Sequence, residues 1–421
     1  MSNQSFYRFA EKLEPWLVVV LLLYFFGPSV PPLIDQVMKA GSYPIIFLLI
    51  IWRWKRFAYF ATRDLLLLLL VGMAMASVFW SAAPDVTSIE TKAILRTTVF
   101  GVYLATRFSI KEQMHLLAWV LGIGAVLSFL LALAIPSYGI HGMDSEAGAV
   151  GAWRGIFVIK NRFASIMILA SGLFLVLALN SPRKRGLFWS LFGLAAVLLF
   201  LSKGKTAYSV FLMSLSLFPL HKFVKQQYKL RVFLLLTALL VGGTAIVLIL
   251  SNLEFIVVDT LGKNMEFNGR LPIWTLMFDK ILERPWLGYG MSGFWTSDEA
   301  LYVLYNSWAE LSLEEGVRFN AHNGYIELCL SLGFLGFSLY TLHFLTVFIK
   351  TVNLWISTKS MEIFWILQTL VVLFFLNFAD SISILGTGSL WSFYVSMAIS
   401  TAVQQSRIRK SGQLRRVLSS G

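Results

Sequence analysis

The sequence is poor in charged residues and nearly free of cysteine. Only 14% of its 421 residues are Asp, Glu, Lys or Arg, whereas soluble domains carry about 25%. Cys329 is the single cysteine, which excludes a disulfide framework and a thiolate metal site. The five histidines are scattered along the chain, so the sequence predicts no metal site.

Apolar residues dominate instead, at 57% of the chain with a mean hydropathy of +0.72. This composition predicts an all-α integral membrane protein of about twelve transmembrane helices, because runs of about 20 apolar residues span a bilayer. The apolar run after Trp16 has no signal-peptide cleavage pattern and is taken as the first span. The second run is short and could be re-entrant. The predicted spans cover about residues 15–31, 43–54, 64–80, 93–108, 114–135, 163–180, 186–202, 206–220, 232–251, 323–349, 362–379 and 388–404.

A net charge of +13 could indicate a nucleic-acid partner, but the basic residues are spread over short loops between apolar runs. This is the pattern of the positive-inside rule. With the N-terminus inside, the predicted cytoplasmic segments hold 22 of the 35 basic residues and 5 of the 22 acidic ones. We therefore expect a multi-pass protein of the bacterial cytoplasmic membrane with both termini in the cytoplasm and no nucleic-acid partner.

The longest break in the apolar pattern runs from about residue 251 to 336. It predicts three parts: 1–251 with nine transmembrane helices, 252–321 as an extracytoplasmic (periplasmic) loop containing short helices, and 322–421 with the last three transmembrane helices and a basic cytoplasmic tail. Chemistry that needs water and a polar substrate is expected in or beside this loop.

Two phosphate-binding patterns are rejected. Gly288 to Gly293 fits G-x-G-x-x-G but lacks the strand and βαβ unit that give the pattern its meaning. Gly204-Lys205-Thr206 ends like a phosphate loop, but Leu199 stands where the earlier glycine belongs. Neither pattern predicts a nucleotide site.

Three outward-facing basic groups remain, Lys205, Arg270 and His322. Interfacial snorkelling, a surface ion pair and a loop histidine are their ordinary roles, and spacing alone favours these. Several motifs around them add information. They are Gly269-Arg270-x-x-x-Trp274, the run from Glu283 to Gly290, His322-Asn323-Gly324-Tyr325-Ile326-Glu327 and Gly333-Phe334-Leu335-Gly336.

In their order and spacing, over roughly residues 90–400, these motifs resemble the O-antigen ligase/polymerase superfamily of GT-C-like membrane glycosyltransferases. The resemblance implies transfer of a glycan from undecaprenyl diphosphate to an acceptor sugar on the outer leaflet. The sugar–phosphate bond is already activated, so the resemblance implies neither a metal nor another cofactor. The implied partners are the lipid-linked oligosaccharide, an acceptor glycan or glycolipid, membrane lipids, and chain-length and export proteins.

The resemblance also implies roles for the three basic groups. Arg270 matches the family's diphosphate-binding arginine, and a guanidinium fork suits phosphate oxygens. Lys205 falls where the family usually has arginine and keeps the charge without the fork. His322 matches the essential histidine. At a predicted helix N-terminus its imidazole is disfavoured as a cation, so it can take the acceptor hydroxyl's proton. One direct displacement would invert the anomeric carbon.

The stretch from Trp153 to Arg162 resembles the W-R-G-x-F-x-H-K-N segment of exopolysaccharide polymerases, although Ile159 stands where that segment has histidine. Arg154, Lys160 and Arg162 remain as a cationic surface for the lipid diphosphate or an anionic sugar, with anchoring to lipid headgroups as the alternative.

Aromatic residues in the outer loop are candidates to stack on sugar rings, although interfacial packing is as good an explanation for each. Glu327 lies off the face of His322 and is not expected to orient the imidazole. The candidate sugar-binding residues are Trp274, Tyr289, Trp295 and Tyr325.

The favoured function is a polysaccharide polymerase, because of the segment 153–162. The alternative is an O-antigen ligase that transfers the glycan to lipid A-core or to a protein. A third reading is a transporter or flippase of lipid-linked sugars, but such proteins usually show internal repeats with broken spans in matching positions. The sequence shows neither feature.

Overall fold

A computed structural model describes residues 3–143, 149–224, 270–310, 319–381 and 384–419. These residues form helices joined by loops, with isolated β-bridges at Pro28–Phe157 and Ile140–Trp153. The α-helices are α1 (Asn3–Phe25), α2 (Pro32–Ile51), α3 (Trp54–Ala61), α4 (Leu65–Ala76), α5 (Pro84–Arg107), α6 (Ile110–Ala134), α7 (Pro136–Gly139), α8 (Lys160–Asn180), α9 (Arg185–Leu201), α10 (Lys205–Ser216), α11 (Phe218–Val224), α13 (Arg270–Glu283), α14 (Leu301–Tyr305), α16 (Gly324–Thr358), α17 (Met361–Ala379) and α18 (Ser389–Ser419).

The all-helical membrane fold is confirmed, but not the number of spans. In the described part of the chain, six helices are long and apolar enough to cross a membrane, or seven if α3 and α4, bent by 93°, form one span. The predicted spans at 15–31, 93–108, 206–220 and 388–404 fall on α1, α5, α10 and α18, which are helical but lack the required length or hydropathy. The span at 232–251 lies outside the described residues. The short second span is part of the 20-residue helix α2.

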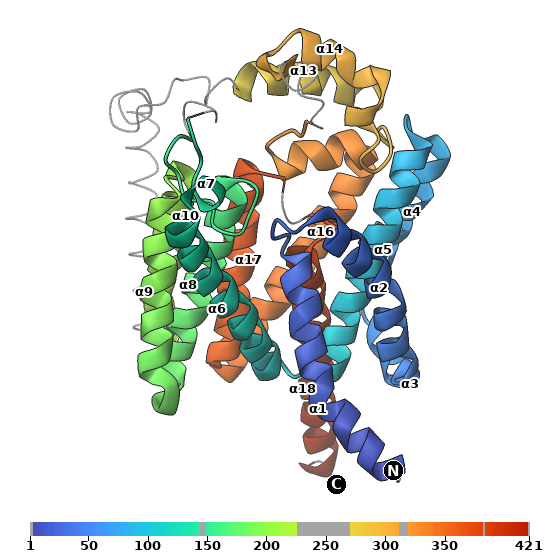
Figure 1. The fold of residues 1–421 in the computed structure, drawn as a ribbon. Coiled ribbons are helices and arrows are strands. Elements are labelled where there is room, and N and C mark those ends of the chain that lie inside the picture. Colours follow the sequence, from blue (N-terminus) through green and yellow to red (C-terminus); the bar gives the residue numbers. More distant parts are fainter. Residues whose placement is uncertain (1–2, 144–148, 225–269, 311–318, 382–383, 420–421) are drawn as a thin grey trace.

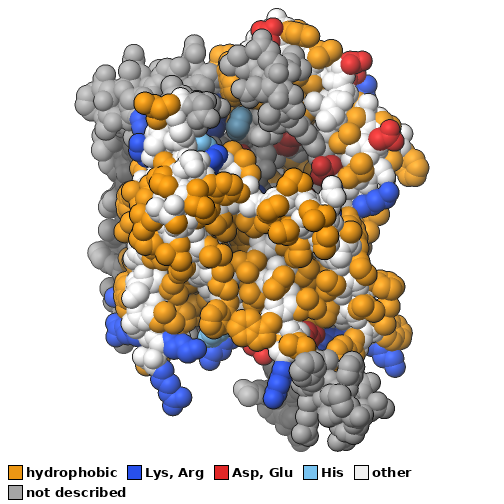
Figure 2. All heavy atoms as spheres, in the orientation of Figure 1, with side chains coloured by type: hydrophobic (Ala, Val, Ile, Leu, Met, Phe, Trp, Pro, Cys, Tyr) orange, Lys and Arg blue, Asp and Glu red, His pale blue; other side chains and the backbone are white. Residues whose placement is uncertain are grey.

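The helices form one bundle whose two termini lie at the same end, while α13 and α14 cap the opposite end (Figure 1). On the face shown in Figure 2, apolar side chains cover the middle of the bundle in a broad band, and Lys and Arg gather along its lower rim. Such a band is what a membrane-embedded surface presents to lipid. The chain is therefore a multi-pass membrane protein.

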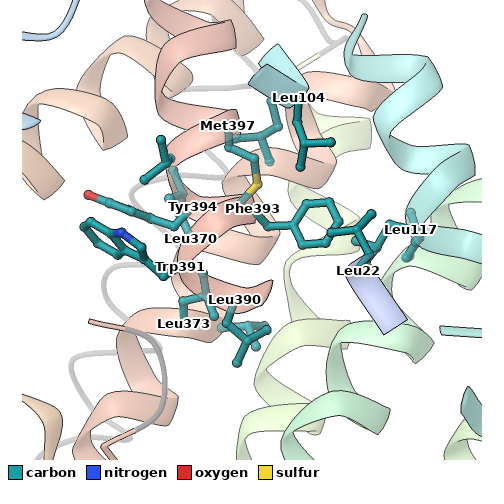
Figure 3. Packing of buried hydrophobic residues seen from close by; sticks show 14 of the residues in the cluster. Leu22, Leu104, Leu117, Leu370, Leu373, Leu390, Trp391, Phe393, Tyr394 and Met397 are labelled. Atoms are coloured by element: carbon teal, nitrogen blue, oxygen red, sulfur yellow. The ribbon is translucent and has the colours of Figure 1, made fainter. Parts of the chain in front are cut away.

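The core lies where α1, α5, α6, α17 and α18 meet (Figure 3). Leu22, Leu117 and Phe393 come together from three of these helices. Trp391 on α18 is fully buried, and its indole Nε1 donates a hydrogen bond of 2.8 Å to Thr98 Oγ1 on α5. This packing fixes α18, and with it the loop that precedes α18 at residues 384–388.

Helix α16 is broken at Gly333, which has φ 61° and ψ −168°. The loop from Pro285 to Tyr289 supplies partners at the break, since Phe334 N donates to Pro285 O at 2.7 Å and Tyr289 N donates to Leu330 O at 2.7 Å. A Cβ at Gly333 would lie 2.4 Å from the Trp286 carbonyl. The glycine motifs of this region therefore let two backbone segments approach closely.

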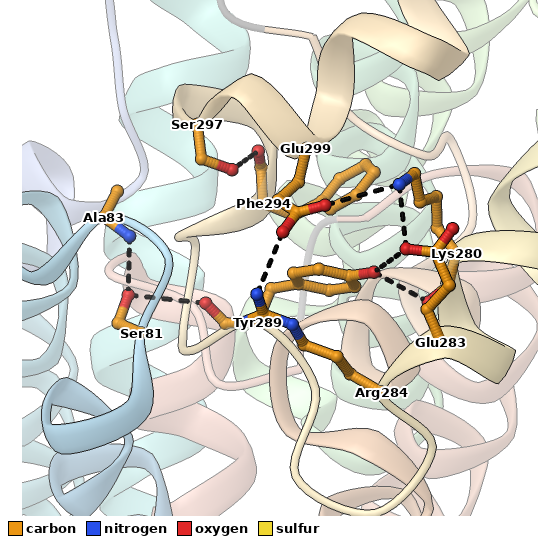
Figure 4. Close-up of polar contacts among 9 residues, drawn as sticks. All are labelled: Ser81, Ala83, Lys280, Glu283, Arg284, Tyr289, Phe294, Ser297 and Glu299. Atoms are coloured by element: carbon orange, nitrogen blue, oxygen red, sulfur yellow. Dashed lines mark hydrogen bonds and ion pairs between the residues drawn. The ribbon is translucent and has the colours of Figure 1, made fainter.

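The other side of the same loop is held against the start of α5 (Figure 4). Ser81 Oγ donates to Tyr289 O at 3.3 Å, and Ala82 N donates to the same oxygen at 2.9 Å. We call residues 270–310 the outer segment. Within it, Arg284 Nη2 pairs with Glu299 Oε1 at 2.9 Å. The outer segment is thus fastened both to α5 and to α16, which sets the position of the residues on either side of it.

A buried carboxylate ties three segments together near the terminal end of the bundle. Glu14 on α1 has a side chain only 2% exposed and accepts from Arg53 Nη2 at 3.1 Å, Arg107 Nε at 2.7 Å and Tyr103 OH at 2.5 Å. Removing one member of a buried ion pair costs about 3 kcal/mol. We expect Glu14→Gln to lower the thermal unfolding midpoint in detergent, with the exposed Glu11→Gln as control. Equal midpoints for the two variants would contradict a stabilising role.

Candidate active site

A cavity of about 600 Å³ opens among segments that are far apart in the sequence. Its wall comes from the end of α1, the first turns of α2, one face of α5, the start of α8, residues 291–292 and 319–328, and the loop before α18. The wall carries both signs of charge, so it can bind an anionic group and hydroxyl groups together. The charged residues that line it are Asp35, Lys39, Glu90, Arg96, Arg162 and Glu327.

Next to this cavity, three basic side chains gather around Asp380, the residue that follows α17. His322 Nδ1 lies 4.0 Å from Asp380 Oδ1. The charge of Asp380 also acts on the guanidinium groups of Arg162 and Arg270. Burial lowers the pKa of Arg270, and the neighbouring Asp380 carboxylate opposes that shift. The structure therefore brings together two of the predicted cations and the predicted histidine.

Sequence reasoning missed Asp380. The residue follows an apolar run that ends at Asn377-Phe378-Ala379, and its side chain is buried. One sequence signal could have identified Asp380. It is an acidic residue at the outer end of a predicted span, on the same side of the membrane as the predicted cations Lys205 and Arg270. Its carboxylate supplies a negative charge that acts on Arg162 and Arg270 and lies 4.0 Å from His322 Nδ1.

Arg162, the third residue of α8, lies on the cavity wall. A Cβ added to Gly388 would lie 2.9 Å from Arg162 Nη2 and 2.9 Å from Phe25 O. The guanidinium therefore occupies the space beside Gly388 at the end of α1, and the glycine leaves room for it. Of the candidate diphosphate-binding residues, Arg162 is the one that lines the cavity.

His322 adopts φ 48°, a left-handed conformation that costs a non-glycine residue about 1–3 kcal/mol. Its backbone N donates to Asn320 Oδ1 at 2.8 Å, and its ring stacks on Trp308 with centroids 6.1 Å apart. Helix α16 begins just after it, where Asn323 Oδ1 accepts from Tyr325 N at 3.0 Å. Strain of this kind persists where surrounding contacts fix the conformation, as is common at functional sites.

Two residues hold the backbone beside His322. Trp274 Nε1 donates to Ala321 O at 2.9 Å, and Glu327 Oε2 accepts from Ala321 N at 2.9 Å. Glu327 also accepts from Trp295 Nε1 at 2.9 Å. Through these contacts Glu327 fixes the peptide that adjoins His322. Trp274, a candidate sugar contact, has its indole N–H committed to the same peptide.

The other candidate sugar-binding aromatics lie in packed surroundings. Tyr289 is fully buried, and its OH donates to Lys280 O at 2.9 Å. Burial and the nearby Glu283 carboxylate raise the pKa of Tyr289, so its phenol stays protonated. Tyr325 OH donates to Phe374 O at 2.9 Å. Neither tyrosine belongs to the cavity wall formed by the described residues.

Arg154, Lys160 and Lys205 are also absent from that wall as far as the structure describes it. Arg154 Nε donates to Tyr138 O at 2.9 Å and Nη2 to Ser137 O at 3.3 Å, which holds α7 in place. Lys160 and Lys205 are the first residues of α8 and α10. In the turn before α10, Lys203 Nζ donates to Val150 O at 3.2 Å.

Among the described residues, no group of three or more His, Cys, Asp or Glu side chains could hold a metal ion. The arrangement around Asp380 instead combines fixed positive charge with one imidazole. Fixed cations stabilise negative charge that develops on a leaving group, and an imidazole can accept a proton from a hydroxyl group. These are the elements of a displacement at a carbon attached to a phosphate ester.

We expect Asp380→Asn to slow the reaction of this site by about tenfold, because two arginines and the histidine would lose the charge that balances them. The rate with the purified protein in vesicles is the measurement. Asp279→Asn, an exposed residue of α13, is the matched control. A fully active Asp380→Asn protein would show that the carboxylate does not organise the site.

In a comparison with protein families, residues 147–341 match the model of the O-antigen ligase domain (Wzy_C). The matched range contains Arg162, Arg270 and His322, while Asp380 lies beyond it. No curated protein matches the chain. The resemblance predicted from the motifs is thus confirmed. The chain is a membrane protein that carries a domain of the O-antigen ligase family over residues 147–341.

Proposed function

We propose that the chain moves a glycan from undecaprenyl diphosphate to an acceptor sugar and acts as a polysaccharide polymerase. The observation that carries the proposal is the convergence of Arg162, Arg270 and His322 on Asp380, beside a cavity that Arg162 lines. In support, all three residues fall within residues 147–341, which match the O-antigen ligase domain model.

In the proposed reaction, the acceptor hydroxyl oxygen attacks the anomeric carbon of the donor sugar. The bond from that carbon to the phosphate oxygen breaks, and the lipid diphosphate leaves with the electron pair. Arg162 and Arg270 stabilise the charge that grows on the diphosphate. Nδ1 of His322 faces Asp380 at 4.0 Å, and its other nitrogen, Nε2, takes the proton of the attacking hydroxyl. A single displacement inverts the anomeric carbon and requires no metal.

We also propose the orientation of the protein in the membrane. The basic rim and both termini lie at one end of the bundle, and α13 and α14 at the other (Figures 1 and 2). The positive-inside rule puts the basic rim in the cytoplasm. Residues 252–321 then form a periplasmic segment between the membrane parts 1–251 and 322–421, and the cavity receives its substrates from the outer leaflet.

The polymerase reading is preferred over the ligase reading because the segment 153–162 resembles that of exopolysaccharide polymerases and leads into Arg162. A broken helix, such as α16, is also found in transporters, where the break lines the substrate site. Here the break at Gly333 is filled by the loop from Pro285 to Tyr289. The break therefore gives no support to a flippase.

The decisive experiment is a deletion strain whose lipids are extracted and separated. Single repeat units that accumulate on the lipid carrier, with no polymer, are the expected result. Full-length polymer left on the carrier would instead assign the protein as a ligase. Repeat units retained on the inner leaflet would assign a flippase and contradict the proposal.

A further inference from the structure

Arg96 on α5 is a buried arginine that lines the same cavity. Its side chain is 8% exposed. Nη1 donates to Ser42 Oγ at 3.0 Å and to Lys39 O at 3.4 Å. The guanidinium also lies over the rings of Phe25 and Tyr43, at 4.9 and 4.7 Å from their centroids. Contacts with α1 and α2 thus hold this cation in one position.

The charge of Arg96 lacks a direct counter-ion in the described part of the protein. No described carboxylate lies within ion-pairing distance of the guanidinium, and its buried Nε has no hydrogen-bond partner. By contrast, Arg53 and Arg107 both pair with Glu14. A buried, uncompensated cation in a membrane bundle is costly, and such residues usually mark a path or site for an anion.

Acidic residues line the same cavity wall, but none of the described ones forms an ion pair with Arg96. Asp35 acts on Arg96 through its charge, but its Oδ1 accepts a hydrogen bond of 3.1 Å from Tyr24 OH. Glu90 and Glu327 line the cavity as well, and Glu327 is held by Trp295 and Ala321 N. The wall thus carries an arginine able to meet an anion, flanked by carboxylates that suit sugar hydroxyls.

Arg96 and Arg162 both lie near Phe25 at the end of α1. The Phe25 ring lies under the Arg96 guanidinium. The Phe25 carbonyl and Arg162 Nη2 both lie 2.9 Å from the position of a Cβ built on Gly388. Both arginines line the one cavity. The cavity wall therefore carries two arginines besides Lys39, and of these two Arg162 is the one that lies near Asp380 with Arg270 and His322.

We propose that Arg96 binds the phosphate of a second lipid-linked saccharide, the acceptor, while Arg162 and Arg270 bind that of the donor. This inference rests on the proposed polymerase function, in which both saccharides are carried on lipid phosphates. A guanidinium fork suits two phosphate oxygens at once, and the flanking rings keep it oriented. The sugar of the acceptor then lies between Arg96 and Arg162, and its hydroxyl group is directed towards His322.

The test uses the full-length protein in nanodiscs of phosphatidylcholine, with a constant concentration of lipid-linked donor. The acceptor glycan is supplied in two forms, on a lipid diphosphate and on an uncharged lipid. For the wild type we expect a KM at least about tenfold lower for the diphosphate form, the usual gain from hydrogen bonds to a charged group. Arg96→Gln should remove this difference by raising the KM for the diphosphate form.

Two further variants make the result specific. Lys92→Gln, an exposed residue of the same helix, should behave as the wild type. Arg96→Lys should recover part of the preference, since it keeps the charge but loses the fork. A loss of transfer to both acceptors in Arg96→Gln, together with a lower unfolding midpoint, would show that Arg96 serves packing and would overturn the proposal.

Other outcomes of the same experiment distinguish a failure of the proposed Arg96 site from a failure of the proposed polymerase function. Wild-type transfer with equal KM values for both acceptors would overturn the Arg96 site and leave the polymerase function standing. Absence of wild-type transfer to either acceptor would overturn the function itself. If added phosphatidylglycerol abolished the preference, Arg96 would be assigned to a phospholipid headgroup rather than to the acceptor.

Discussion

His322→Ala is expected to lower the rate of glycan transfer by about 10²–10⁴-fold, the usual contribution of a general base. The imidazole is held by stacking on Trp308 and by the hydrogen bond from its backbone N to Asn320 Oδ1. Removing the side chain leaves the cap of α16 by Asn323 in place. The loss should therefore appear in kcat with reconstituted protein, and little in the binding of the donor.

His115→Ala provides the matched control, because His115 is a histidine of α6 outside the cavity whose Nδ1 contacts Lys111 O at 2.7 Å. It should leave the rate unchanged. His322→Gln, which keeps a polar group but cannot accept the proton in the same way, should be nearly as slow as His322→Ala. Near-full transfer by either His322 variant in vesicles would show that another group takes the proton.

The helices could be predicted because hydropathy is a local property of the sequence. Eleven of the twelve predicted spans overlap helices of the structure, with shifted ends such as those of α1 and α2, and the twelfth lies outside its described residues. Not every such helix is apolar enough to count as a candidate membrane span. Helix α5 is an example, because it carries five charged residues: Asp85, Glu90, Lys92, Arg96 and Arg107. Those charges are placed by tertiary partners, such as Glu14 for Arg107, which hydropathy does not report.

The sequence indicated a shared site for Arg270 and His322 only through the family motifs. The roles of neighbouring residues depend on contacts between distant segments. Tyr289 and Trp274 were candidates for sugar binding, yet their polar atoms contact Lys280 O and Ala321 O. The role of Asp380 depends on the fold, which brings the end of α17 close to the starts of α8 and α13. No local sequence pattern shows that these three segments come together.

Arg270→Ala is expected to lower kcat for glycan transfer by about 10²–10³-fold, as does removal of one group that stabilises developing negative charge. Arg270 begins α13, and its guanidinium is partly buried close to Asp380. Arg270→Lys should restore part of the rate, because the charge remains and the bidentate geometry is lost. Rates with purified protein and a labelled donor provide the measurement.

Arg284→Ala is the matched control, since Arg284 lies in the same outer segment but pairs with Glu299 at 2.9 Å. It should lower stability slightly and leave kcat unchanged. A second check uses the double variant Arg270→Ala with Asp380→Asn. Because Asp380 balances the charge of Arg270, the two losses should be less than additive, as expected for groups that interact directly. Full additivity would mean that the two residues act independently, and equal activity of Arg270→Ala and wild type would remove Arg270 from the site.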